Sequence, residues 1–204
     1  MLFCKIFAFA IIFFCLSNAG TLRADAYLRG FQALEQRDYK TALYYLSLFA
    51  ANGDTKANYN LGIMYRAGLG VKKDDVQSLV HLIEAAENGH MLGNYAVGLA
   101  FLNGKGSDVD VQAAIHYLSE AALLGHAISP VELGSLYFRG RLVEKNFVSA
   151  HFWWSLAHDR NAPGASKNLV TLLSKMNQKQ KKQAFSLQNK CRKITLKQCL
   201  NSGL

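Results

Sequence analysis

Apolar residues in the middle of the chain recur every three or four positions, which is the spacing of one face of an α-helix. The apolar positions are Ala57, Leu61 and Tyr65 in a first stretch and Val76, Leu79, Ile83 and Ala86 in a second. Gly68 and Gly70 lie between the two stretches, and glycine readily adopts the left-handed conformation that follows a helix end. Asp74 or Asp75 can cap the second helix by accepting its free amide hydrogens. The pattern therefore predicts a pair of helices joined by a short loop.

The same pattern returns with a period of 36 residues. The clearest repeated positions are Leu61-Gly62, Val97-Gly98 and Leu133-Gly134, together with Ala85-Ala86 and Ala121-Ala122. His90 and His126 also share one position of the repeat. A shorter unit that lacks four loop residues precedes these, and Ala165 and Leu169 restart the pattern after them. A fixed period of this length is typical of proteins built from stacked repeats.

Two short helices cannot bury their apolar faces alone, so the repeats are expected to stack. The predicted fold is all-α: a right-handed α/α solenoid of helix-turn-helix units with a C-terminal capping helix. Gly62 and the Ala85-Ala86 pair are small where two helices of a unit must cross closely. The expected units are residues 25–54, a degenerate first repeat, then 55–90, 91–126 and 127–162, followed by capping helices and a basic tail at 163–204.

These residues resemble the Sel-one-like repeat (SLR) family, which is related to the tetratricopeptide repeat. The family pattern is a helix with A-x-x-x-L-G-x-x-Y, a G-x-G-V loop, an Asp, then A-x-x-W and A-A-x-x-G. Residues 57–89 follow it closely, whereas His81 and Tyr117 stand where Trp153 fits the pattern, and Arg141-Leu142 replaces a second loop glycine. The resemblance implies a protein that scaffolds or regulates complexes.

The first residues have the pattern of a secretory signal peptide, predicted at residues 1–19. Lys5 is followed by an apolar run from Ile6 to Leu16, and Ser17-Asn18-Ala19 offers small residues for cleavage after Ala19. An uncleaved anchor is the alternative. Eleven apolar residues are too few to span a bilayer at 1.5 Å per residue, which favours cleavage. The protein is therefore expected to be secreted or periplasmic.

The end of the chain is expected to form the cap. Asn177 and Gln180 have the spacing of a capping box that opens a helix to about Lys190, with Met176, Ala184 and Leu187 as its apolar stripe. In an oxidising compartment, a disulfide between Cys191 and Cys199 would stabilise the tail by roughly 2–3 kcal/mol. Two free thiols are the alternative, and a metal pair is disfavoured because no further ligands share the spacing.

The net charge of +9 is concentrated in the tail, because residues 160–204 contain ten Lys or Arg and no Asp or Glu. The basic residues proposed to act together are Lys175, Lys179, Lys181, Lys182, Lys190, Arg192, Lys193 and Lys197. They could hold an anionic envelope surface or an acidic partner. A solvated helix face is the alternative. Nucleic acid is not an expected partner of an exported chain.

Motifs of catalysis are missing from the sequence. No serine is followed three residues later by lysine, and neither G-x-S-x-G nor H-E-x-x-H occurs. The glycine loops follow helices rather than strands, which argues against phosphate binding. The histidines lack ligand spacing, so no catalytic residue, metal site or small-molecule cofactor is predicted.

A surface groove remains as the candidate site. The first helices of stacked pairs line the concave side of a solenoid, and residues opposite their core face point into it. Those residues are Tyr27, Phe31, Leu34, Tyr59, Ile63, Arg66, Tyr95, Leu99, Leu102, Val131, Ser135, Phe138 and Arg139. Tyr and Phe are expected to anchor a peptide, with Arg66 and Arg139 meeting its carboxylates. The alternative is that the aromatic residues pack between units.

The function expected from these observations is a non-enzymatic adaptor, exported to the cell envelope, that binds a peptide or protein. An enzyme is one alternative, since a cysteine-rich SLR branch binds or hydrolyses penicillins, but its members carry a disulfide within each repeat and this chain has none there. A structural component of an envelope motor or secretion complex is the other alternative.

Overall fold

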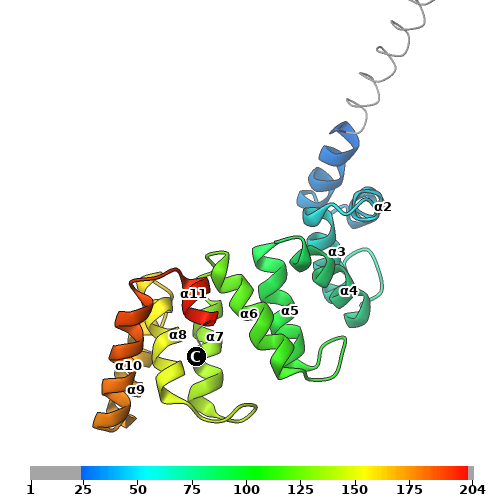
Figure 1. Cartoon of the computed structure of the whole chain (residues 1–204). Helices are drawn as coiled ribbons and strands as arrows, with labels where there is room; N and C mark the ends of the chain where they lie inside the picture. The colour runs from blue at the N-terminus through cyan, green and yellow to red at the C-terminus, as the bar shows by residue number, and fades with distance from the viewer. Residues whose placement is uncertain (1–23, 202–204) are drawn as a thin grey trace, which may run out of the picture.

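The computed structural model describes residues 24–201, and these residues form helices and no strand (Figure 1). Residues 24–35 are helical. The helices that follow are α2 (Tyr39–Ala50), α3 (Thr55–Ala67), α4 (Asp75–Glu87), α5 (Met91–Asn103), α6 (Val111–Leu123), α7 (Ser129–Arg139), α8 (Phe147–Asp159), α9 (Ala165–Lys175), α10 (Gln178–Cys191) and α11 (Leu196–Asn201). The predicted signal peptide, residues 1–19, lies outside the described residues. No helix within residues 24–201 is both long and apolar enough to cross a membrane.

Each helix from α2 to α8 packs chiefly against the helix before it and the helix after it in the chain. The tightest pairs are α3 with α4, α5 with α6 and α7 with α8. Figure 1 shows these pairs following one another from α2 to the α9–α10 end of the molecule. The predicted all-α solenoid of helical hairpins is confirmed.

A glycine allows the two helices of each unit to approach closely. A Cβ atom at Gly62 would lie 2.6 Å from Leu82 Cγ and 3.1 Å from the Ser78 carbonyl oxygen, and one at Gly98 would lie 2.6 Å from Leu118 Cγ. Gly134 faces the Trp154 ring in the same way. The predicted need for small residues at these crossings is therefore confirmed.

The expected ends of the helices are also observed, and one residue of the expected apolar face of α4 is corrected. Gly68 ends α3 in the left-handed region, with φ of 70°. Asp74, not Asp75, caps α4 by accepting hydrogen bonds from the amides of Val76 and Gln77. Val76 is 56% exposed and does not belong to the buried face. That face centres on Leu82, and Val76 lies about 120° around the helix from it at 100° per residue.

The fifth unit departs from the others because it lacks the crossing glycine. Val170 of α9 occupies the repeat position of Gly62, Gly98 and Gly134. The Val170 side chain is 70% exposed, and α10 packs against α8 instead of forming the close pair with α9 that α4 forms with α3. The Val170 position is therefore not a helix crossing, and the close pairing of helices ends with α7 and α8 in the described part of the chain.

The C-terminal cap forms as predicted. The Asn177 side chain accepts a hydrogen bond from the Gln180 amide, and the Gln180 side chain accepts one from the Asn177 amide. Met176 and Ala184 are buried and Leu187 is partly buried. The Cys191–Cys199 disulfide joins α10 to α11. It places Cys199, together with Leu196 and Leu200, in the apolar cluster that contains Phe152 and Trp153 of α8 and Leu118 of α6.

Candidate interaction surface

The two repeat histidines accept hydrogen bonds from backbone amides at the junctions between units. His90 Nδ1 accepts a hydrogen bond from the Gly93 amide at 3.0 Å, and His126 Nδ1 accepts one from the Ser129 amide at 3.2 Å. Asp54, at the same repeat position, accepts from the Ala57 amide at 2.8 Å. Asp54 and His90 are the N-caps of α3 and α5, whereas the N-cap of α7 is Ile128, so His126 binds the first amide of α7 from just outside the helix.

Four residues expected in the groove pack against this capping position. The Tyr59 ring lies 4.3 Å from the His90 ring, and the Tyr95 ring lies 4.3 Å from the His126 ring, measured between centroids. The Tyr27 hydroxyl hydrogen-bonds Asp54, which helps to raise the pKa of the tyrosine after the larger effect of burial. Val131, the equivalent residue in the next unit, packs in the cluster that contains Ala162. These four side chains therefore pack against the last residue of their own unit, at the junction with the next unit.

The remaining apolar groove candidates of the first, second and fourth units are also partly buried by packing. Phe31 and Leu34 belong to the apolar cluster around Leu46, and Ile63 belongs to the one around Leu82. The Phe138 ring lies 5.1 Å from the Trp154 ring and 5.7 Å from the Phe147 ring. Internal contacts therefore cover much of the surface of these aromatic side chains, in agreement with the packing alternative.

Protonation of the capping histidines should destabilise the fold. Burial lowers the pKa of His90 and of His126, and Lys56 and Arg160 respectively lower them further. The unfolded chain, with histidine pKa values near 6.5, then binds more protons than the folded chain. Stability is therefore fully present above about pH 6.5 and is lost as the pH falls through the folded pKa values.

We expect the thermal midpoint to fall by several degrees between pH 7.5 and pH 5, as followed by circular dichroism. The double variant His90→Asn/His126→Asn keeps a capping oxygen and should lose part of this pH dependence. Part should remain, because burial also lowers the pKa of His81 and His151. An unchanged pH dependence in the double variant would rule out the capping histidines as its source.

Two adjoining hollows lie beside α5 and are lined by the remaining groove candidates, of which Leu102 also packs against the apolar cluster around Leu118. The first, of about 200 Å³, is lined by Arg66, Asp75, Ser78, Leu79, Leu82, Ala96, Leu99, Ala100, Asn103 and Lys105. The second, of about 410 Å³, is lined by Leu99, Leu102, Asn103, Glu132, Ser135, Leu136, Arg139, Arg141 and Leu142. Both include Leu99 and Asn103, so they form one continuous surface across α5, here called the trough.

The trough is lined by apolar side chains and by four exposed cations, Arg66, Lys105, Arg139 and Arg141. Arg66 and Arg139 lie in the last turns of α3 and α7. Lys105 and Arg141 follow the capping glycines of α5 and α7 and lie 36 residues apart, at one repeat position. This arrangement suits a ligand that offers both carboxylates and apolar groups.

A comparison with known families identifies the repeats of this fold. The family model described as Sel1 repeat matches residues 17–54, 55–90, 92–126 and 131–161, which is more than half of the chain. This chain belongs to the Sel1 repeat family. Sel1 repeats mediate protein–protein interactions.

Individual relatives match only parts of their own length. The ERAD-associated E3 ubiquitin-protein ligase component HRD3B of Arabidopsis thaliana is 42% identical over 48 residues, which are 24% of this chain and 8% of that protein. A Sel1 repeat protein from Oxalobacter formigenes has 25% identity and a TM-score of 0.64, covering 70% of this chain and 59% of that one. The protein c5321, a protective antigen present in uropathogenic Escherichia coli strains and displaying an SLR fold, has 28% identity and a TM-score of 0.71, covering 80% and 36%. This chain therefore spans less than two thirds of each.

In this Sel1 repeat chain, two buried asparagines at equivalent positions tie each first helix to the preceding unit. Asn58 donates to the carbonyls of Ala50 and Asp54, and Asn94 donates to those of Ala86 and His90. Sequence reasoning missed both, although their spacing of 36 residues was available as a signal. Pro130 occupies the next equivalent position and has no amide side chain, and there Arg160 donates to the His126 carbonyl at 3.0 Å.

The positions where the Trp of the family pattern is missing are filled by stacked rings. The His81 ring lies 5.5 Å from the Tyr65 ring and its Nδ1 is 2.9 Å from Asn58 Oδ1. The Tyr117 ring lies 5.9 Å from the Phe101 ring. Both departures from the pattern therefore keep an aromatic contact within their unit. Within residues 24–201, no three His, Cys, Asp or Glu residues are grouped so as to hold a metal ion.

The cations of the basic tail are divided among several surfaces. Lys179, Lys182 and Lys190 of α10 line a shallow hollow together with Gln183, Ser186 and Leu187. Lys175, Lys193 and Lys197 are exposed elsewhere, and Lys181 is partly buried. Of the predicted basic residues, Lys179, Lys182 and Lys190 thus share one surface.

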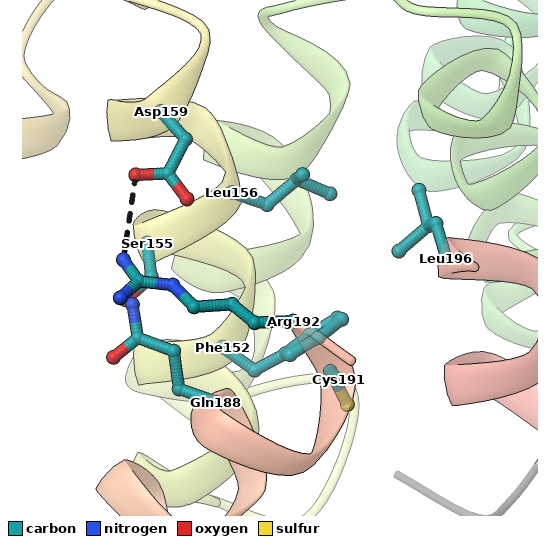
Figure 2. Close-up of a pocket in the computed structure, with 8 residues that line it drawn as sticks. All are labelled: Phe152, Ser155, Leu156, Asp159, Gln188, Cys191, Arg192 and Leu196. Atoms are coloured by element: carbon teal, nitrogen blue, oxygen red, sulfur yellow. Dashed lines mark ion pairs between the residues drawn. The ribbon is translucent and has the colours of Figure 1, made fainter. Parts of the chain in front are cut away.

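Arg192 takes part in a different feature, a small hollow of about 110 Å³ between α8 and the disulfide-closed tail (Figure 2). Arg192 reaches from the end of α10 toward Asp159 of α8, with 4.0 Å between Nη2 and Oδ1. Leu196 of α11 lies on the opposite side of the hollow, and Phe152 and Leu156 contribute apolar side chains from α8. The tail therefore folds back over α8, an arrangement that sequence reasoning did not predict.

Proposed function

We propose that this chain is a non-enzymatic adaptor of the cell envelope, or a secreted one, that binds a peptide or a segment of another protein along the trough. The continuity of the two hollows across Leu99 and Asn103 carries the proposal. Apolar surface that remains accessible in a hollow, next to unpaired charged groups, is the composition of a protein-binding site.

Membership of a family whose repeats mediate protein–protein interactions supports this function. The Cys191–Cys199 disulfide supports export, because disulfides persist in oxidising compartments. The pattern of residues 1–19 is consistent with the same destination. The proposed location is therefore the periplasm or the cell exterior.

The proposal includes a second contact, made by the lysines of α10 with an anionic envelope surface. Lys179 and Lys182 line one hollow together with Lys190 and the apolar side chain of Leu187. Lysines gathered on one surface are attracted to anionic lipid.

Selection of binding peptides tests the trough. The chain without residues 1–19, with its disulfide formed, would be used to select from a displayed library of random 16-residue peptides. We expect selected peptides to bind the variant Leu99→Glu at least tenfold more weakly in fluorescence anisotropy, because Leu99 lines both hollows.

The matched control is Val80→Glu, which places the same charge on the exposed side of α4, where Val80 is 55% exposed. It should leave binding unchanged, and both variants should keep the thermal midpoint of the parent chain. Equal loss of binding in the two variants, or none in Leu99→Glu, would overturn the assignment of the trough.

A further inference from the structure

The four trough cations form no ion pair with an acidic residue of the described part of the chain. Ion pairs within the described residues join Arg29 to Asp25, Lys73 to Asp75 and Arg192 to Asp159, and none includes a trough cation. Asp75, which lines one hollow, is 3.6 Å from Lys73 Nζ. Glu132 is then the one remaining carboxylate among the described residues that line the two hollows.

The cations stand next to apolar surface. Leu142 directly follows Arg141 and is 48% exposed, and Leu99 and Leu102 are partly buried in the same hollow. Arg66 and Arg139 also lie where a cation complements the negative end of a helix. That role does not account for Lys105 and Arg141, which lie beyond the capping glycines.

The trough cations also belong to neighbouring units. Lys105 follows α5 and Arg141 follows α7 at the same repeat position, and α6 packs against both of these helices. The two cations therefore lie in successive units. A ligand can therefore meet cations of successive units with acidic residues that are separated along its sequence.

From this geometry we infer that the occupant of the trough is an acidic peptide segment, in which carboxylates separated by apolar residues meet the cations of neighbouring units while the apolar residues cover Leu99, Leu102 and Leu142. This inference rests on the proposed function and adds to it the chemistry of the partner. The net positive charge and the apolar lining of the trough carry it together.

Synthetic peptides test the inference. A 12-residue probe with repeated Glu-Leu-Leu-Glu spacing would be compared by fluorescence anisotropy with the same peptide carrying Gln for every Glu, and with one carrying Lys. We expect the Glu peptide to bind at least tenfold more tightly than the Gln peptide, and binding to weaken as salt rises from 50 to 300 mM. The Lys peptide should not bind measurably.

Charge variants of the protein complete the experiment. Lys105→Ala/Arg141→Ala should weaken binding of the Glu peptide five- to tenfold, whereas Lys167→Ala, on exposed α9 surface, should leave it unchanged. The thermal midpoint should not move in either. Equal affinity for the Gln peptide, or no loss in the double variant, would overturn the inference.

The sequences of the library-selected peptides separate this inference from the proposed function. Enrichment of Asp and Glu among peptides sensitive to Leu99→Glu would support both. Neutral or basic peptides that depend on Leu99 would sustain the trough as a binding site and overturn its acidic partner. Failure to select any peptide sensitive to Leu99→Glu would overturn the proposed function itself.

Discussion

Gly134→Val is expected to lower the free energy of unfolding by about 3 kcal/mol or more, at the upper end of the cost of overpacking a core. A Cβ atom at Gly134 would lie 2.8 Å from Trp154 Cγ. The Trp154 ring cannot move aside easily, because its Nε1 donates to the Val131 carbonyl at 3.1 Å and its face packs against Phe138. The pair formed by α7 and α8 should therefore separate.

Urea unfolding followed by circular dichroism measures this effect. Val170→Ala is the matched control, since Val170 occupies the same repeat position in α9 but is 70% exposed. That variant should change stability by no more than about 0.5 kcal/mol, as exposed substitutions usually do. An unfolding midpoint for Gly134→Val equal to that of the parent chain would show that the helices of a unit do not cross at this glycine.

Reduction of the Cys191–Cys199 disulfide is expected to lower the free energy of unfolding by about 2–3 kcal/mol, as loop-closure entropy predicts for a short loop. Without the disulfide, α11 is still held by contacts of Leu196, Cys199 and Leu200 with the cluster that includes Phe152. Release of α11 would expose that cluster. Unfolding in urea with and without dithiothreitol measures the difference, and protease cleavage after residue 191 should become faster.

The variant Cys191→Ser serves as the control for side effects of the reductant. It changes the less buried cysteine of the pair, and its stability should match that of the reduced parent chain and should not respond to dithiothreitol. If the oxidised parent chain unfolds at the same urea concentration as the reduced one, the tail does not contribute to stability.

The solenoid could be predicted from the sequence because each of its determinants repeats. The 36-residue spacing of Gly62, Gly98 and Gly134 marked the helix crossings, and these glycines do face Leu82, Leu118 and Trp154. The capping box at Asn177 depends only on residues close in sequence, and it forms as predicted. Val170, at the repeat position of the crossing glycines, also marks where the regular stacking ends. This signal can be recognised only once the close crossing of the helices at that position is known.

The candidate site was less predictable, because helical periodicity does not say what lies opposite each face. Tyr59 and Tyr95 lie opposite the expected core face, yet the histidine that ends the same unit packs against each of them. Leu99, Leu102 and Arg139 were expected at the surface and do line the trough. Lys105 and Arg141 lie in loops, where periodicity gives no direction, so only the three-dimensional structure brings them to the same surface.

Amide hydrogen exchange, measured with and without a library-selected peptide, tests most directly whether the trough is the interaction surface of this Sel1 repeat chain. We expect the backbone amides of α5 and α7, and those of residues 104–106 and 140–142, to exchange more slowly when the peptide is bound. The amides of α2 should change little. Protection confined to α2, α4 and α6, with none in α5 or α7, would contradict it.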